Sequence, residues 1–91
     1  MLSAKTKRRL INALTRKSLA DEMEAALATP ASLSAKLKRA LIVALAGKAA
    51  GDEAAAAAAS PAALSAKTKA RIRLAMASKS AGDEVIAQLE S

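Results

Sequence analysis

The sequence predicts an all-α protein built from three tandem helical hairpins. A segment of 31 residues recurs without gaps, beginning at Leu2, Leu33 and Leu64. In each copy a serine precedes a run of strong helix formers. Val, Ile and Thr are few, aromatic residues are absent, and no apolar–polar alternation is sustained, which argues against strands. We therefore expect one small repeat domain over residues 1–91, a small solenoid or an irregular helical bundle, with repeats at 2–32, 33–63 and 64–91.

The first helix of each repeat is expected to begin after Ser3, Ser34 or Ser65, because serine suits the N-cap position. At about 100° per residue, its apolar side chains fall on one side and its basic side chains on the other. The second helix is expected to be short, about 7–9 residues, and to stop before Pro30 or Pro61. Alanines recur in this helix and permit close approach to the first: Ala25, Ala56 and Ala87.

Two glycines are expected to form the turn between these helices. Gly51 and Gly82 suit the left-handed residue that follows a helix, and the aspartate after each would cap the second helix. The first repeat has no glycine before Asp21, so its turn differs.

The apolar content is dominated by alanine, which supplies 27 of 48 apolar residues. So few bulky side chains make a weak core for a chain of this length, and we expect contact with another copy or a larger assembly to complete it. Two arrangements stay open: the repeats stack within one chain, or the Ala-rich second helix of the second repeat docks on a partner. The apolar side chains expected to bind a partner are Leu10, Leu14, Leu41, Ile42, Leu45, Ile72 and Met76.

Charge is segregated within each repeat, and the net charge is +7. Basic residues crowd the first turns of the first helix, where the helix dipole disfavours cations. Three interpretations follow: they pair with the Asp-Glu turn of a neighbouring repeat, they are only solvated, or they bind an anionic surface of phosphates or acidic side chains. The residues concerned are Lys5, Lys7, Arg8, Arg9, Lys36, Lys38, Arg39, Lys67, Lys69, Arg71 and Arg73.

The residue inventory argues against an enzyme. Without His or Cys, the chain offers no imidazole base, no thiolate and no usual zinc or copper ligands. Asp21 and Glu22 are adjacent and point about 100° apart on a helix, which does not suit a carboxylate dyad. Gly47, expected inside a helix, has no glycine-rich phosphate loop around it. We expect no cofactor, no metal and no small-molecule substrate.

Two other partners receive less support from the sequence. The longest uncharged run, residues 54–66, is too short to span a bilayer and contains Pro61, so we expect no membrane partner. Residues 1–19 are basic and acid-free like a transit peptide, but the same pattern recurs later in the chain. Without aromatic residues or a nucleic-acid motif, binding to nucleic acid would be nonspecific and salt-dependent. A basic nucleic-acid-coating protein is nevertheless the rival hypothesis.

The pattern LSAKTK followed by AL or AM, a lysine and GDE is clearest at 64–84 and 33–53. It resembles short helical segments near the ends of bacteriophage structural and virion proteins, and the likeness extends over nearly the whole chain. The resemblance implies an accessory protein that decorates or cements a phage head or tail, located in the virion; without it the default location is cytoplasmic. The sequence thus predicts a non-enzymatic assembly protein, with an artificially regularised repeat as a third alternative.

Overall fold

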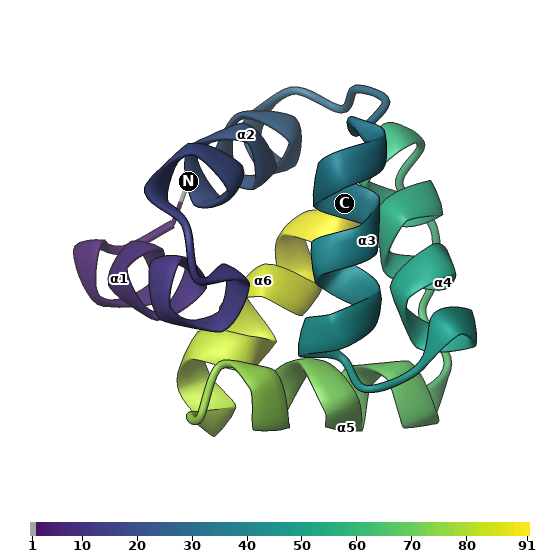
Figure 1. Cartoon of the computed structure of the whole chain (residues 1–91). Coiled ribbons are helices and arrows are strands. Elements are labelled where there is room, and N and C mark those ends of the chain that lie inside the picture. The colour runs from purple at the N-terminus through teal and green to yellow at the C-terminus, as the bar shows by residue number, and fades with distance from the viewer. Residues whose placement is uncertain (1) are drawn as a thin grey trace.

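The computed structural model describes residues 2–91, and the part of the chain that it describes folds as helices and connecting loops without any strand (Figure 1). This confirms the all-α prediction. Each repeat contributes one packed pair of helices. The pairs are α1 (Ala4–Leu14) with α2 (Lys17–Ala28), α3 (Ala35–Ala44) with α4 (Lys48–Ala59), and α5 (Ala66–Ala75) with α6 (Lys79–Glu90).

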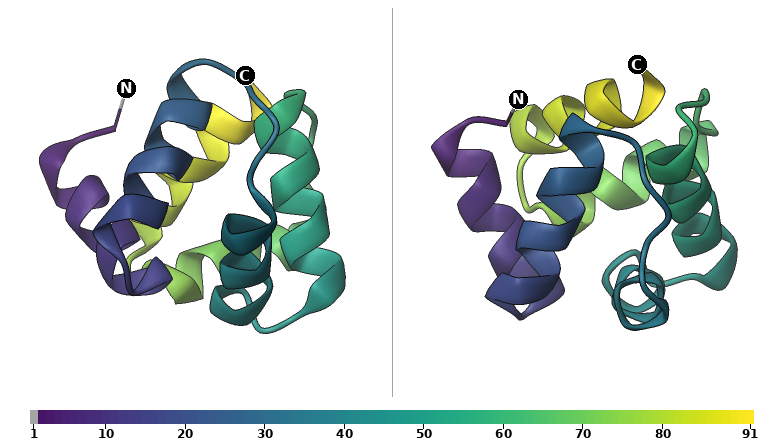
Figure 2. Two further views of the ribbon diagram at one scale, coloured as in Figure 1. Left: turned by 45° about the horizontal axis from the view of Figure 1, so that its top comes forward. Right: turned by 90° about the horizontal axis from the view of Figure 1, so that it is seen from above.

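The three pairs close into a ring instead of extending as an open solenoid. The contacts that join successive repeats, α2 with α3 and α4 with α5, recur between α6 and α1. The second helices α2, α4 and α6 also contact one another. The first and last repeats therefore lie side by side, and the molecule measures 25 × 25 × 23 Å (Figures 1 and 2). Residues 31 positions apart occupy equivalent places, so the fold has approximate threefold symmetry.

The predicted serine caps are confirmed. The hydroxyl oxygens of Ser3, Ser34 and Ser65 accept the backbone N–H three residues later, which begins α1, α3 and α5. The leucine before each serine is buried, so the start of every repeat is held both by a hydrogen bond and by the core. These leucines are Leu2, Leu33 and Leu64.

The predicted position of the turn is wrong. Gly51 and Gly82 lie inside α4 and α6 instead of in a turn. Both are buried where the second helix crosses the first. A Cβ on Gly51 would lie 2.7 Å from the Ile42 Cα, so only glycine permits this close approach. The left-handed backbone falls earlier in the chain, at Thr15, Ala46 and Ala77.

The second helices accordingly begin earlier and run longer than expected, with 12 residues each. Their N-cap residues are Arg16, Gly47 and Ser78, so the aspartates do not cap them and Gly47 does not lie inside a helix. Each Asp-Glu pair is instead one turn inside its helix. From this position the glutamate side chain reaches the start of the first helix of the next repeat.

The three repeats share one core. The buried side chains of all six helices form a single cluster, to which the Ala-rich α4 contributes five alanines. The buried face of that helix is therefore covered within the chain itself. Ring closure lets a small number of bulky side chains cover one another, so this fold does not require contact from outside to bury its apolar residues.

The seven apolar residues expected to bind a partner lie within or against this core. Ile42 is half-buried and packs beside Gly51. The others are buried, so none of these six offers an exposed apolar face: Leu10, Leu14, Leu41, Leu45, Ile72 and Met76. The helical periodicity of these residues therefore indicated the core of this chain and not a surface for a partner.

Candidate functional site

A glutamate from each repeat binds the serine cap of the next, and this contact runs around the whole ring. Glu22 accepts the Ser34 N–H at 2.8 Å, and Glu53 accepts the Ser65 N–H at 2.6 Å. Glu84 closes the ring by accepting the Ser3 N–H at 2.6 Å. In each case the serine hydroxyl also donates to the same carboxylate: Ser34, Ser65 and Ser3.

The predicted pairing of a basic turn with the Asp-Glu turn of a neighbouring repeat is wrong, because every ion pair in the described chain lies within one repeat. The acidic turn meets the start of the next first helix, yet its partner is the serine rather than a lysine. A carboxylate at a helix N-terminus also interacts favourably with the exposed N–H groups and the helix dipole.

Two of these glutamates have a further partner. The Thr68 hydroxyl donates to Glu53 and the Thr6 hydroxyl donates to Glu84, and both threonines are 2 % exposed. These hydroxyl bonds, followed by the serine N–H bonds, lower the pKa of both glutamates below the ordinary value. At the equivalent place beside Glu22 the chain has Leu37, whose fully buried side chain has no donor for the carboxylate.

The remaining carboxylates are also engaged inside the chain. Three aspartates each accept a hydrogen bond from the lysine four residues earlier. Asp83 accepts a second one from Arg73, and the bonds from Lys79 and then from Arg73 lower the pKa of this carboxyl. Glu24 pairs with Lys7. Glu90 accepts the Leu64 N–H and pairs with Lys69; the N–H bond is the larger cause of its lowered pKa. All eight acidic side chains thus have partners.

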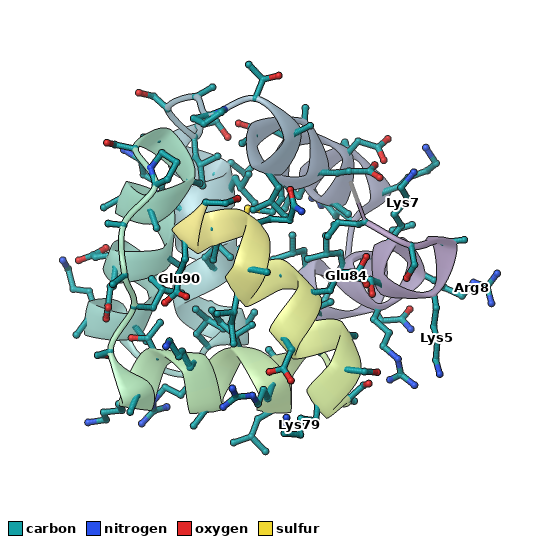
Figure 3. The ribbon with its side chains drawn as sticks, turned by 180° about the vertical axis from the view of Figure 1, so that it is seen from behind. Lys5, Lys7, Arg8, Lys79, Glu84 and Glu90 are labelled. Carbon is teal, nitrogen blue, oxygen red and sulfur yellow. The ribbon has the colours of Figure 1, made fainter. Side chains whose placement is uncertain are left out.

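The cations divide into an engaged and an unengaged set. Five of the predicted anion-binding residues are occupied by the chain: Lys7, Arg9, Lys69, Arg71 and Arg73. The side chains of the other six make no hydrogen bond or ion pair within residues 2–91, and all are exposed on the first turns of α1, α3 and α5: Lys5, Arg8, Lys36, Lys38, Arg39 and Lys67. Lys5 and Arg8 extend outward from α1 (Figure 3).

Sequence reasoning missed one member of the unengaged set, Arg16. It is exposed at the N-cap of α2, and its side chain has no hydrogen bond or ion pair within residues 2–91. Its place depends on the left-handed Thr15 before it, and a non-glycine residue gives no clear sequence signal for that conformation.

Arginine side chains clamp two of the three junctions between first helices. The Arg9 guanidinium donates to the Met76 and Ala77 carbonyls at 3.1 and 3.2 Å. Arg71 donates in the same way to the Leu45 and Ala46 carbonyls at 3.1 and 2.9 Å. Each clamp therefore holds the left-handed turn that ends the neighbouring first helix.

The third junction, between the end of α1 and the side of α3, has no clamp. The equivalent residue is Ala40, and the Thr15 hydroxyl donates to the Leu14 carbonyl at 2.6 Å instead. A groove of about 330 Å³ lies here, against about 120 Å³ for the groove beside Arg9. We call the larger one the open groove; it is lined by Ala13, Leu14, Thr15, Arg16, Leu19, Lys36, Arg39, Ala40 and Val43.

Large apolar side chains are exposed at one repeat position. Val43 on α3 is 76 % exposed and Leu74 on α5 is 79 % exposed, whereas α1 has Asn12 at the equivalent place. Of the two apolar residues, Val43 lines the open groove. Val43 therefore offers an exposed apolar contact beside the unengaged Lys36 and Arg39.

Neither metal chemistry nor membrane insertion receives structural support. Within residues 2–91 no three His, Cys, Asp or Glu side chains come together as metal ligands. The described helices are also too short or too polar to cross a bilayer.

Comparisons of the chain with family models, with curated proteins and with solved structures found no match.

Proposed function

We propose that this protein is a non-enzymatic binding module that docks on an acidic surface of another protein within a larger assembly. The observation that carries the proposal is the division of charge: every Asp and Glu side chain has a partner within residues 2–91, whereas seven Lys and Arg side chains have none there. A basic surface of this kind favours association with acidic partners and steers the encounter.

The same division argues for a different chain as the partner. Two copies would each bring a charge of +7 and no unengaged carboxylate to an interface. Such copies repel one another rather than attract. Self-association, which the small core first suggested, therefore has less support than a heteromeric contact.

The assembly we propose is a bacteriophage head or tail, with this protein as a decorating or cementing component of the virion. The support for this is the resemblance of the repeats to segments of virion proteins. A closed domain with exposed cations suits such a role, because little ordering entropy is lost when a preformed surface docks.

A specific observation also favours the rival function, nonspecific nucleic-acid binding. Six of the unengaged cations lie at helix N-termini, which attract phosphates. Against this, the cations are distributed over three separate helix starts, and the chain has no aromatic residue on which bases could stack.

A selection from a random peptide library displayed on messenger RNA tests the proposal without a known partner. We expect the chain to enrich peptides that combine Asp or Glu with a large apolar residue. Their affinity should exceed that for a short DNA duplex, and the difference should widen between about 50 and 200 mM salt. Enrichment of no acidic peptide, or tighter binding of DNA at both salt concentrations, would contradict the proposal.

The repeat supplies a matched pair of variants for this test. Replacing Lys5, Lys36 and Lys67 by Gln removes three unengaged charges, and replacing Lys17, Lys48 and Lys79 by Gln removes three that pair with aspartates. Each variant loses three positive charges, one from the same position of each repeat. We expect the first to weaken binding of the selected peptides about tenfold and the second less than about threefold.

A further inference from the structure

The open groove exists because one repeat departs from the other two at a single position. Arg9 and Arg71 each place a guanidinium across a left-handed turn, and Ala40 leaves that space empty. Threefold symmetry alone would give three similar junctions. The chain thus has one junction without an arginine clamp, whereas its two counterparts are clamped.

The lining of the open groove combines two kinds of surface. Its apolar part includes Leu14, Ala40 and the exposed Val43. Its charged part consists of Arg16, Lys36 and Arg39, none of which has a partner in the described chain. No carboxylate lines it. The volume of about 330 Å³ lies within the range in which protein pockets commonly hold ligands.

We propose that the open groove receives a short segment of another protein that carries carboxylates beside a large apolar side chain. This inference rests on the proposed function and locates its docking site. The apolar side chain packs against Val43 and fills the space that an arginine occupies at the other junctions. The carboxylates bind the three cations, and charge-assisted bonds to arginine add specificity.

Other occupants fit this lining less well. A phosphate backbone satisfies the cations but brings no apolar group to the apolar part. A guanidinium from a partner could reach the unclamped carbonyls, but it would meet three cations. A second copy of the chain offers no unengaged carboxylate, since all eight are bound internally. Charge complementarity therefore favours an acidic segment of a different protein.

The decisive variant is Ala40→Arg, measured as the affinity for peptides selected by the wild-type chain. The fold already accommodates arginine at the two equivalent positions, so the substitution should close the groove without disturbing the helices. It also adds a positive charge. We expect at least tenfold weaker peptide binding, together with equal or slightly tighter binding of duplex DNA.

A second pair of variants isolates the apolar contact. Val43→Ser removes the exposed apolar residue of the groove, and Leu74→Ser removes its equally exposed counterpart on α5. We expect Val43→Ser to weaken peptide binding several-fold and Leu74→Ser to leave it unchanged. This pair remains informative even if Ala40→Arg folds poorly.

The outcomes separate this inference from the proposed function. If Ala40→Arg and Val43→Ser bind the peptides as tightly as wild type while the Lys5, Lys36 and Lys67 variant still binds weakly, the docking site is wrong and the proposed function stands. If the wild-type chain selects no acidic peptide, the proposed function fails. Dimerisation of the wild type in sedimentation, abolished by Ala40→Arg, would assign the groove to a second copy and overturn the acidic segment.

Discussion

The junction between the first and second repeats is built differently from the other two. At the second–third and third–first junctions, a buried threonine hydroxyl reaches the capping glutamate and an arginine clamps the turn. At the first–second junction the equivalent residues are Leu37 and Ala40. Glu22 consequently has only the serine as its partner, and the turn has no clamp.

This difference shows that the same junction between repeats can be stabilised either by a hydroxyl hydrogen bond or by apolar burial. Leu37 is fully buried, so apolar burial replaces the hydroxyl bond at that junction. The Thr15 hydroxyl donates to the Leu14 carbonyl in place of an arginine, but it fills no space across the turn, and the open groove lies there. The departures from the repeat are therefore more informative about function than its shared positions, which account for the fold.

Replacing Leu37 by Ala should have the largest effect on stability. The side chain is fully buried, so we expect the free energy of unfolding to fall by about 2–5 kcal/mol, measured by urea denaturation. Leu37→Thr should cost less, because the threonine hydroxyl can donate to Glu22 as Thr6 and Thr68 donate to their glutamates. Equal losses for both variants would contradict the idea that the two chemistries are interchangeable.

Replacing the capping glutamates should have the next largest effect on the free energy of unfolding, and the size of the loss should differ between junctions. Glu53→Ala leaves the buried Thr68 without its carboxylate partner, and we expect a loss of about 1–3 kcal/mol. Glu22→Ala removes only bonds to the exposed Ser34, for which we expect about 0.5–1.5 kcal/mol. Both values come from the same denaturation experiment. A loss in Glu22→Ala as large as that in Glu53→Ala would remove the distinction between the junctions.

The arginine clamps should contribute a smaller amount. Arg71→Ala removes two bonds to backbone carbonyls near the surface, and we expect it to lower the free energy of unfolding by about 0.5–1.5 kcal/mol. Ala40→Arg should raise it by a similar or smaller amount, since it adds the missing clamp. Thermal unfolding of the two variants checks the opposite signs. If Ala40→Arg destabilises the chain, the junctions are not equivalent in backbone geometry.

The pH dependence should show the smallest difference. The pKa values of Glu53 and Glu84 are lowered in the folded chain, so their contribution to stability is present above the ordinary value of 4.5 and is lost as the pH falls through the lowered values. Replacing both by Gln should flatten part of the acid loss of stability. Asp83 and Glu90, whose pKa values are also lowered, should retain the remainder. An unchanged acid profile would show that these hydrogen bonds do not favour the ionised glutamates.

The sequence predicts much of the fold because the decisive signals are local. The serine caps and the helical apolar stripe depend on neighbours within a turn or two, and the 31-residue period repeats these signals along the chain. The turns were misplaced because Gly51 serves close helix packing, whereas the left-handed positions carry Ala46 and Ala77, which give no such signal.

The candidate site was less accessible to sequence reasoning. Ring closure joins residues as far apart as Ser3 and Glu84, and no local pattern reports that contact. The basic cluster was found, but which cations are engaged depends on the folded chain. The apolar residues assigned to a partner proved to be the core, because an amphipathic stripe does not reveal whether its cover comes from the same chain.

Amide chemical-shift mapping of the ¹⁵N-labelled wild-type chain tests the central claim most directly. A peptide from the library selection is titrated in, and residues 14–19 and 36–43 are compared with the equivalent segments of the other two junctions. We predict saturable shifts confined to the open groove, absent in Ala40→Arg. Shifts of equal size at all three junctions, or only at the exposed starts of α1 and α5, would show that charge acts without the groove.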